Sequence, residues 1–260
     1  PLVLTEHGIY TKERRIELLG AEWLKEASTN AGSDAASEIG YIRQLWIRFF
    51  EHLGYLTYQA ADDIVALYET NRQRQHSDGA PPERTQNIPN GVDIERFAAL
   101  RVLRPATPPP VLCLIGRVVP IKDIKTFIRA VRSVVNQQPQ AEAWIAGPED
   151  ESPEYARECR ELVSQLGLED KVTFLGFQKL TDLLPKIGLV VLSSISEALP
   201  LVILEGYAAG VPTLTTDVGS CRQLVFGLPG EDAAIGAAGR VVRIADPEAL
   251  AQAARELLSV

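Results

Sequence analysis

The chain has 260 residues, 46% of them hydrophobic, so it is long enough to bury one large core or two medium ones. Its net charge of -8 is the opposite of the clustered Lys and Arg excess that a phosphate-backbone binder needs, so nucleic acid is not an expected partner. The sequence has no apolar run of the roughly 18 residues that a membrane span requires and no basic-then-apolar signal at its start, so it predicts a cytoplasmic protein.

The first part of the chain carries two apolar, strand-like runs, at residues 1–5 and 63–67. Helical patterns are expected around residues 16–19, at 37–58 and at 71–78. Residues 88–93 are expected as a strand end that runs into an Asn-Gly turn. The chain opens on a strand and contains no Met, and its last helical pattern stops without a cap, so we expect a piece of a longer protein.

A proline-rich segment, residues 104–110, is the expected linker, because proline excludes regular helix and strand pairing. It predicts one domain over residues 1–103 and another over residues 111–260. In the second domain short apolar strands alternate with helices. The expected strands are residues 111–115, 141–146, 172–174, 189–192 and 213–215. The expected helices are residues 123–135, 153–166, 200–209 and 247–260.

This alternation is typical of an α/β fold in which helices cover both faces of a parallel sheet, that is, a Rossmann-like doubly wound domain. Ligands of such sheets bind beyond the carboxyl ends of the strands. Three cysteines, Cys113, Cys159 and Cys221, lie far apart and support neither a disulfide framework nor a metal cluster. We expect them to be buried or half-exposed free thiols.

The loop after the strand 111–115 holds Gly116, Arg117 and Lys122 ahead of a helix. Glycine allows close backbone approach, and two cations before a helix start could both reach one anionic group. By itself this spacing is equally consistent with two solvated surface cations.

The loop after the strand 189–192 ends near Glu197, and Glu205 lies about two turns into the following helix. Glu197 is then close to the positive end of the helix dipole. The alternative is an ordinary acid at a helix N-terminus and an exposed or backbone-satisfied Glu205.

In combination these features are more specific. The basic pair, the two glutamates with seven residues between them, the run 208–212 and the run 88–93 together resemble the retaining glycosyltransferases of family 4. The resemblance implies the GT-B fold, with residues 111–260 as the nucleotide-sugar donor domain and residues 1–103 as part of a second Rossmann-like domain on the acceptor side. Three further runs, at residues 4–18, 71–75 and 216–222, are similar to an exopolysaccharide-synthesis branch of that family.

The resemblance also implies roles. Arg117 and Lys122, with Gly116 and the backbone N–H groups of Leu201 and Val202, would hold the departing diphosphate. The family pattern departs at residues 198–200, where many members have Gly-Phe-Gly or similar, and a proline there offers one amide fewer.

Glu205 would accept hydrogen bonds from the ribose hydroxyls, and Glu197 would face the donor sugar at the reacting carbon. His7, at the end of the first strand, is implied near the donor sugar or the reaction centre. Lys12 and Arg14 are either acceptor or phosphate contacts or solvated helix charges.

The chain has no Asp-x-Asp and no His/Cys cluster with ligand spacing, which favours catalysis without a metal or other cofactor. The resemblance implies a UDP-sugar, with UDP-glucose as the favoured one, and a polysaccharide acceptor as substrates, with a membrane-bound synthase complex as a further partner. Two alternatives remain: a UDP-sugar epimerase of the same fold, and a non-catalytic subunit of a synthase complex. A dehydrogenase is disfavoured, because no Gly-x-Gly-x-x-Gly follows Ile115.

Overall fold

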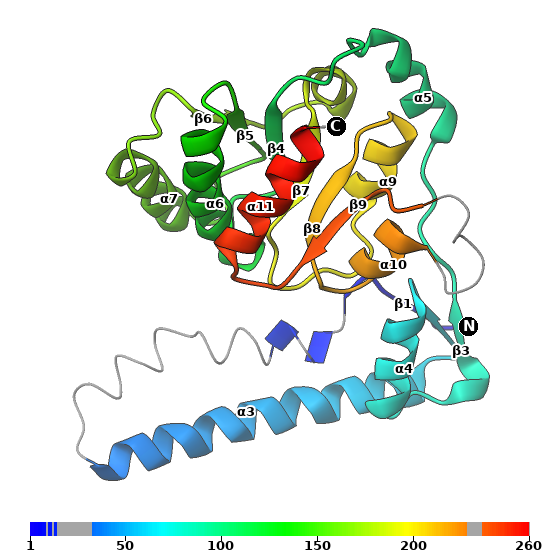
Figure 1. Ribbon diagram of the computed structural model, residues 1–260. Coiled ribbons are helices and arrows are strands. Elements are labelled where there is room, and N and C mark those ends of the chain that lie inside the picture. Colours follow the sequence, from blue (N-terminus) through cyan, green and yellow to red (C-terminus); the bar gives the residue numbers. More distant parts are fainter. Residues whose placement is uncertain (9, 12, 15–32, 228–235, 260) are drawn as a thin grey trace. The chain divides into compact units, whose positions relative to one another are not determined.

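The computed structural model describes residues 1–8, 10–11, 13–14, 33–227 and 236–259 (Figure 1). The chain divides into two compact units, Pro1–Asn90 and Gly91–Val260. None of the described helices combines the length and the apolar character that crossing a bilayer requires.

The first unit is a three-stranded parallel sheet with two described α-helices. Its strands are β1 (Val3–Glu6), β2 (Asp63–Ala66) and β3 (Thr85–Asn87), in the order β1-β2-β3. Its helices are α3 (Ser33–Ala60), α4 (Glu69–Ser77) and the short 3-10 helix η1 (Pro82–Arg84). The two expected strands and the helices at 37–58 and 71–78 are confirmed, whereas the helical pattern at 16–19 lies outside the described residues.

A small core holds the first unit together. Tyr58 and Ala61, at the end of α3, pack with Ile64 of β2 and Ala80. The Tyr58 hydroxyl donates a 2.8 Å hydrogen bond to a carboxylate oxygen of Glu6. Burial and this neighbouring carboxylate raise the pKa of Tyr58. The end of α3 is therefore fixed to the end of β1.

The second unit is built on a six-stranded sheet in which every pairing is parallel, in the order β6-β5-β4-β7-β8-β9. The strands are β4 (Val111–Ile115), β5 (Glu142–Ala146), β6 (Val172–Gly176), β7 (Leu189–Leu192), β8 (Thr213–Thr216) and β9 (Gly239–Val242). The first strand of the unit is central, the second and third lie on one side of it and the last three on the other. This is the Rossmann order, and the doubly wound prediction is confirmed.

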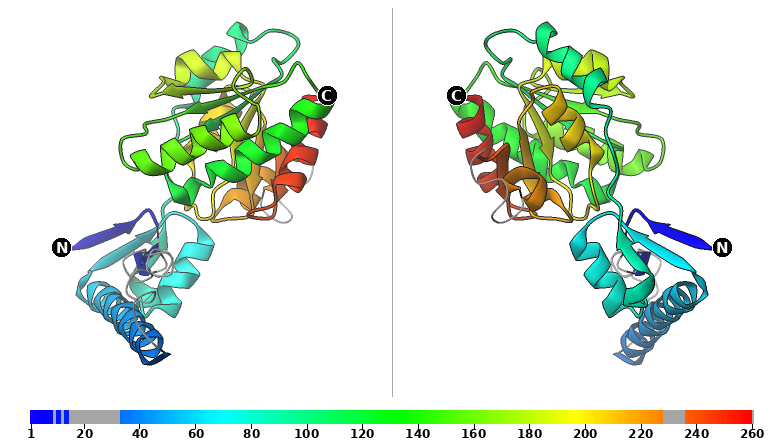
Figure 2. Two further views of the ribbon diagram at one scale, coloured as in Figure 1. Left: turned by 90° about the vertical axis from the view of Figure 1, so that its left-hand side faces the viewer. Right: turned by 90° about the vertical axis from the view of Figure 1, so that its right-hand side faces the viewer.

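Helices cover both faces of this sheet, as the two views of Figure 2 show. One face is covered by α6 (Ile124–Gln137), α7 (Pro153–Gln165) and α11 (Pro247–Leu258). The other is covered by α5 (Ile94–Ala98), α8 (Leu180–Leu183), α9 (Leu201–Ala208) and α10 (Cys221–Phe226), with the 3-10 helices η2 (Ala99–Leu103) and η4 (Leu184–Lys186).

Side chains alternate along the central strands, so each strand supplies both cores. In β4, Leu112 and Leu114 belong to the core under α6, whereas Val111 and Cys113 belong to the core under α9. All three cysteines are buried free thiols, as the sequence predicted. Burial raises the pKa of Cys159 and that of Cys221 to about 11, so both stay protonated at neutral pH.

The sequence did not predict β9, α8 or α10. Strand β9 is short, pairs with β8 and, among the described strands, lies half-exposed at the sheet edge, so it lacks the apolar run of a central strand. Helix α10 spans only Cys221–Phe226, too short for a clear 3.6-residue period.

The proline-rich segment 104–110 lies inside the second unit rather than between the units. Phe97 and Leu100, which precede it, are buried in the core under α9. Arg104 donates hydrogen bonds of 2.8 and 2.9 Å to the carbonyls of Leu184 and Ile187. These contacts attach the segment before the prolines to the second unit, which sequence composition alone does not reveal.

Candidate functional site

The switch point of the second unit lies between the neighbouring strands β4 and β7. The connection after β4 runs through α6 on one face of the sheet, and the connection after β7 runs through α9 on the other. In doubly wound sheets, ligands bind beyond the carboxyl ends of the strands at such a point, where the two connections leave in opposite directions. The loops that border the switch point are residues 116–123 and 193–200.

An ion pair joins these two loops. Lys122, at the end of the 3-10 helix η3 (Pro120–Lys122), lies with its Nζ 2.6 Å from Oε1 of Glu197. Their side chains are only 19% and 11% exposed, so water screens the pair less than it would at the surface. The sequence selected both residues but gave them separate tasks, one on the diphosphate and one on the sugar, and it did not predict their contact.

Two consecutive buried serines hold the loops together. The Ser193 hydroxyl donates a 2.9 Å bond to the backbone carbonyl of Lys122, and the Ser194 hydroxyl donates a 2.6 Å bond to Oε1 of Glu197. Between the backbones, the N–H of Ile195 donates to the carbonyl of Ile121 at 2.9 Å. Sequence reasoning missed both serines, because a serine after a buried strand has many structural uses.

The loop after β8 closes on the same segment. Gly219 has a positive φ of 55°, and a Cβ there would lie 2.4 Å from the carbonyl oxygen of Glu197. Next to it, the N–H and the hydroxyl of Ser220 each donate a 2.9 Å bond to the carbonyl of Ala198. The turn at 219–220 therefore determines where the backbone of Glu197 lies, and only glycine fits both the conformation and the close approach.

Arg117 is exposed and pairs with a different acid. Its guanidinium donates to both carboxylate oxygens of Glu151, at 2.6 and 2.7 Å. Both side chains are about half exposed, 54% and 51%, which is the setting of a weak surface ion pair. Both cations that the sequence selected are thus paired with carboxylates, Lys122 with a largely buried one and Arg117 with an exposed one.

The helix after the Glu197 loop is α9, which starts at Leu201 with the buried Pro200 as its N-cap residue. Leu201 and Val202 form its first turn, so their N–H groups belong to the end of the helix where donors are free of helical partners. Leu201 is 38% exposed and Val202 is half-buried. The start of α9 therefore follows Glu197, the acid of the Lys122–Glu197 ion pair, closely in the chain.

Glu205 lies in the second turn of α9 and is half-buried. Burial raises the pKa of its carboxyl group, and the charge of Arg96 in α5 acts in the opposite direction. Asp93 caps α5 by accepting a 3.0 Å bond from the N–H of Arg96. The run 88–93 therefore ends at Asp93, the N-cap residue of α5. Arg96 in this helix is the cation whose charge lowers the pKa of Glu205 against the effect of burial.

His7 belongs to the first unit, where it follows β1 and is exposed. Lys12 lies outside the described residues. The Arg14 guanidinium carbon lies 5.0 Å from the centroid of the Tyr10 ring, the geometry of a cation–π contact.

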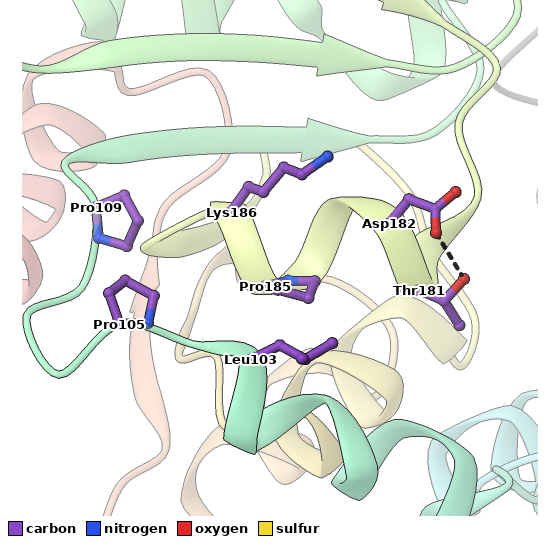
Figure 3. Close-up of a pocket in the computed structure, with 7 residues that line it drawn as sticks. All are labelled: Leu103, Pro105, Pro109, Thr181, Asp182, Pro185 and Lys186. Atoms are coloured by element: carbon purple, nitrogen blue, oxygen red, sulfur yellow. Dashed lines mark hydrogen bonds between the residues drawn. The ribbon is translucent and has the colours of Figure 1, made fainter.

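A surface cavity lies at the opposite end of the second unit. It has a volume of about 620 Å³. It is lined by Leu103, Pro105, Pro109, Thr181, Asp182, Pro185 and Lys186 (Figure 3). Pro109 and Lys186 precede β4 and β7, so the cavity lies at the amino ends of these strands, away from the switch point. None of the candidate site residues that the sequence indicated lines it.

The fold and the site define a class. A doubly wound parallel sheet with charged residues at its switch point is an α/β domain of the Rossmann-like kind, which receives ligands beyond the carboxyl ends of its strands. Within the described residues, no three His, Cys, Asp or Glu side chains are grouped so that they could hold a metal ion.

Comparison with known families narrows the class. The family described as glycosyl transferases group 1 matches residues 109–260, and the chain belongs to this family. A second family, described as a domain of unknown function (DUF3492), matches residues 1–83.

Two curated relatives illustrate the similarity. The D-inositol 3-phosphate glycosyltransferase of Nocardia farcinica is 30% identical over 178 residues, which are 64% of this chain and 40% of that protein. An exopolysaccharide phosphotransferase of Streptomyces coelicolor is 33% identical over 202 residues, 76% of this chain and 20% of that protein. The chain therefore spans less than half the length of either relative.

Solved structures share the fold. Anabaena HepE in complex with UDP aligns with a TM-score of 0.70 and 22% identity, over 100% of this chain and 63% of that one. Sucrose-phosphate synthase from Thermosynechococcus elongatus aligns with a TM-score of 0.67 and 22% identity, over 99% of this chain and 58% of that one. The fold is α/β of the GT-B type.

Proposed function

We propose that the second unit binds a nucleoside diphosphate sugar and that the chain is part of a glycosyltransferase that moves the sugar, with retention, to a growing exopolysaccharide. The observation that carries this proposal is the Lys122–Glu197 pair at the switch point of the sheet, with α9 starting directly after it. The cation and the helix N-terminus at this place suit the diphosphate of such a donor, and the carboxylate suits the hydroxyl groups of its sugar.

The cations and the helix start suit the diphosphate. When the sugar departs, negative charge builds on the diphosphate, and preorganised positive groups lower the energy of that state. Lys122 supplies a charge that is shielded from water, and the N–H groups of Leu201 and Val202 supply donors at the positive end of a helix. Arg117 would add a second cation once it leaves Glu151.

The two carboxylates suit hydroxyl groups. A carboxylate accepts hydrogen bonds and repels phosphate, so Glu197 and Glu205 are better placed against the sugar and the ribose than against the diphosphate. We assign Glu197 to the donor sugar and Glu205 to the ribose. We keep His7, an exposed residue of the first unit, as a candidate catalytic residue.

The finer assignment rests on similarity. HepE is described in complex with UDP-glucose, and the S. aureus TarM mutant and pneumococcal GtfA in complex with UDP, which supports a UDP-sugar and UDP-glucose as the first donor to test. The runs at 4–18, 71–75 and 216–222 resemble PelF, the cytoplasmic glycosyltransferase of Pel exopolysaccharide synthesis. This resemblance supports membership of family 4, a polysaccharide acceptor and a cytoplasmic location. It also supports association with a membrane-bound synthase complex. We propose that the transfer needs no metal.

A donor screen tests the proposal. The full-length protein is incubated with UDP-glucose, other UDP-sugars and GDP- and ADP-sugars, and both free nucleotide and isomeric nucleotide sugar are measured. We expect UDP release from one UDP-sugar, unchanged by EDTA. An isomeric UDP-sugar without UDP release would identify an epimerase, and an absence of both turnover and UDP binding would identify a non-catalytic subunit.

A further inference from the structure

The carboxylate of Glu197 is held at one of its two oxygens. Oε1 accepts a bond from the Ser194 hydroxyl at 2.6 Å and lies 2.6 Å from Nζ of Lys122. Within the described part of the chain, both contacts of this carboxylate fall on Oε1, which leaves Oε2 to a ligand. A hydrogen bond from a hydroxyl to a carboxylate at this distance is of the short, charge-assisted kind.

Ser194 is itself held rigidly. Its side chain is 1% exposed, and its carbonyl accepts a 2.6 Å bond from the hydroxyl of Thr216, at the end of β8. The next residue, Ile195, donates its N–H to the carbonyl of Ile121, in the 3-10 helix that leads to Lys122. The backbone around Ser194 is thus anchored to the segments that follow both neighbours of β7, because β4 leads to Ile121 and β8 ends at Thr216.

The two partners of Oε1 differ in what a bound donor would do to them. Lys122 is the cation that a diphosphate would attract, so its contact with Glu197 is exposed to competition from the ligand. The Ser194 hydroxyl is neutral and buried and has no such competitor. It can therefore hold the carboxylate while Lys122 turns to the phosphates.

We propose that Ser194 is a positioning residue: it keeps the carboxylate of Glu197 in place for the donor sugar when Lys122 is engaged by the diphosphate. This inference rests on the proposed function. The inference adds Ser194 to the cations and carboxylates already assigned. It predicts that loss of the Ser194 hydroxyl lowers kcat but leaves the Kd of UDP unchanged.

The test uses two substitutions of the same shape. Ser194→Thr keeps the hydroxyl and Ser194→Val replaces it with a methyl group, so any steric cost is common to both. The full-chain variants are compared by thermal unfolding, by the Kd of UDP, and by the kcat for hydrolysis of UDP-glucose. We expect Ser194→Val to lower kcat at least about tenfold relative to Ser194→Thr, with the Kd of UDP unchanged within about twofold, since UDP lacks the sugar.

A second pair of variants tests whether Ser194 acts through Glu197. In a Glu197→Gln background we expect the difference in kcat between Ser194→Thr and Ser194→Val to shrink to less than about twofold, because non-additivity identifies groups that work together. If the threonine and valine variants fail to fold, Ser194→Ala is measured in the same two backgrounds, with the same expected loss of kcat and the same shrinkage.

The failures are distinguishable. If the unmodified chain neither binds UDP nor hydrolyses UDP-glucose, the proposed function fails and the positioning role fails with it. If the unmodified chain is active but the hydroxyl makes no difference to kcat, or an equal difference in both backgrounds, Ser194 is a structural residue only and the proposed function stands.

Discussion

Lys122 and Glu197 lie 75 positions apart in the chain, yet their side chains meet at 2.6 Å beyond the ends of two neighbouring strands. The pair is largely buried, and each partner neutralises a charge that would otherwise be desolvated alone. A ligand that carries both a diphosphate and hydroxyl groups can replace each partner's contact with one of its own. The pair is therefore both a structural tie and the point where we expect the donor to bind.

Replacing the cation tests its role in transfer. Because Lys122 would stabilise the departing diphosphate, we expect Lys122→Ala to lower kcat/KM for sugar transfer at least about tenfold, or about 1.4 kcal/mol. The measurement is the initial rate of UDP release in the full chain over a range of donor concentrations. An unchanged kcat/KM would remove Lys122 from the site.

The same ion pair predicts a coupling in stability. Lys122→Met leaves Glu197 with an ionised, largely buried carboxylate and no cation beside it, so we expect a lower Tm than that of the unmodified chain. Adding Glu197→Gln removes that charge, so the double variant should regain most of the lost Tm while its kcat/KM stays low. Strictly additive changes in Tm would contradict the coupling.

Glu205 predicts opposite effects on stability and binding. Burial raises the pKa of its carboxyl group in the folded chain. The stability that this side chain contributes is thus fully present below the unfolded pKa, about 4.3, and is lost as the pH rises through the folded pKa. The ionised carboxylate weakens the fold at neutral pH, so Glu205→Gln should raise Tm at pH 7, and this gain should shrink as the pH falls toward the acid range.

The same substitution should weaken UDP binding, because a carboxylate that accepts ribose hydroxyls is a stronger acceptor than an amide. We expect the Kd of UDP to rise about tenfold or more at pH 7, measured by calorimetry. A variant that is more stable and binds UDP as well as the unmodified chain would show that Glu205 does not contact the nucleotide.

Glu151 competes for Arg117. The pair is exposed, and such pairs contribute about 0–1 kcal/mol, so Glu151→Gln should tighten UDP binding by no more than about fivefold, with the gain lost at high salt. Glu154→Gln is the matched control, because Glu154 is an exposed partner of Arg157 on α7. Equal effects of the two variants would mean a general charge effect rather than release of Arg117.

Gly219 allows a test of close approach. Gly219→Ala adds a methyl group that would lie 2.4 Å from the carbonyl oxygen of Glu197, at a residue with positive φ. Gly167→Ala is the control, since Gly167 has a similar φ of 60° but open space around it. Gly167→Ala should lower stability by about 1 kcal/mol from backbone strain alone. Gly219→Ala should lower stability by more than this, because the backbone at Glu197 must also shift, and only Gly219→Ala should lower kcat for hydrolysis of UDP-glucose. Equal kcat values would argue against a role of the 219–220 turn in placing Glu197.

Much of the fold follows from local pattern. The strands β4 and β7 are apolar on both faces, and their predicted bounds agree with the structure, because a central parallel strand is buried on both sides. The edge strand β9 has no such pattern, so periodicity could not find it. The proline-rich run 104–110 looked like a boundary, but Phe97 and Arg104 attach the preceding segment to the second unit through contacts far away in sequence.

The site was predictable as a set of residues but not as a geometry. Residue type and position selected Lys122 and Glu197, since both follow strands that end at one edge of the sheet. Their contact depends on the exact path of two loops, which Ser193, Ser194 and Gly219 determine through long-range bonds. The sequence also indicated no partner for Arg117, whereas in the structure this residue forms an ion pair with Glu151.

The central claim is that the switch point of the second unit, and not the cavity at the amino ends of β4 and β7, binds a nucleoside diphosphate. It is tested most directly by titration calorimetry of UDP against the unmodified full chain, Lys122→Met and Lys186→Met, a lysine at that cavity. We predict that UDP binds the unmodified chain and Lys186→Met with the same Kd, and that Lys122→Met weakens binding at least about tenfold. UDP binding that is unchanged in Lys122→Met, or lost in Lys186→Met alone, would contradict the claim.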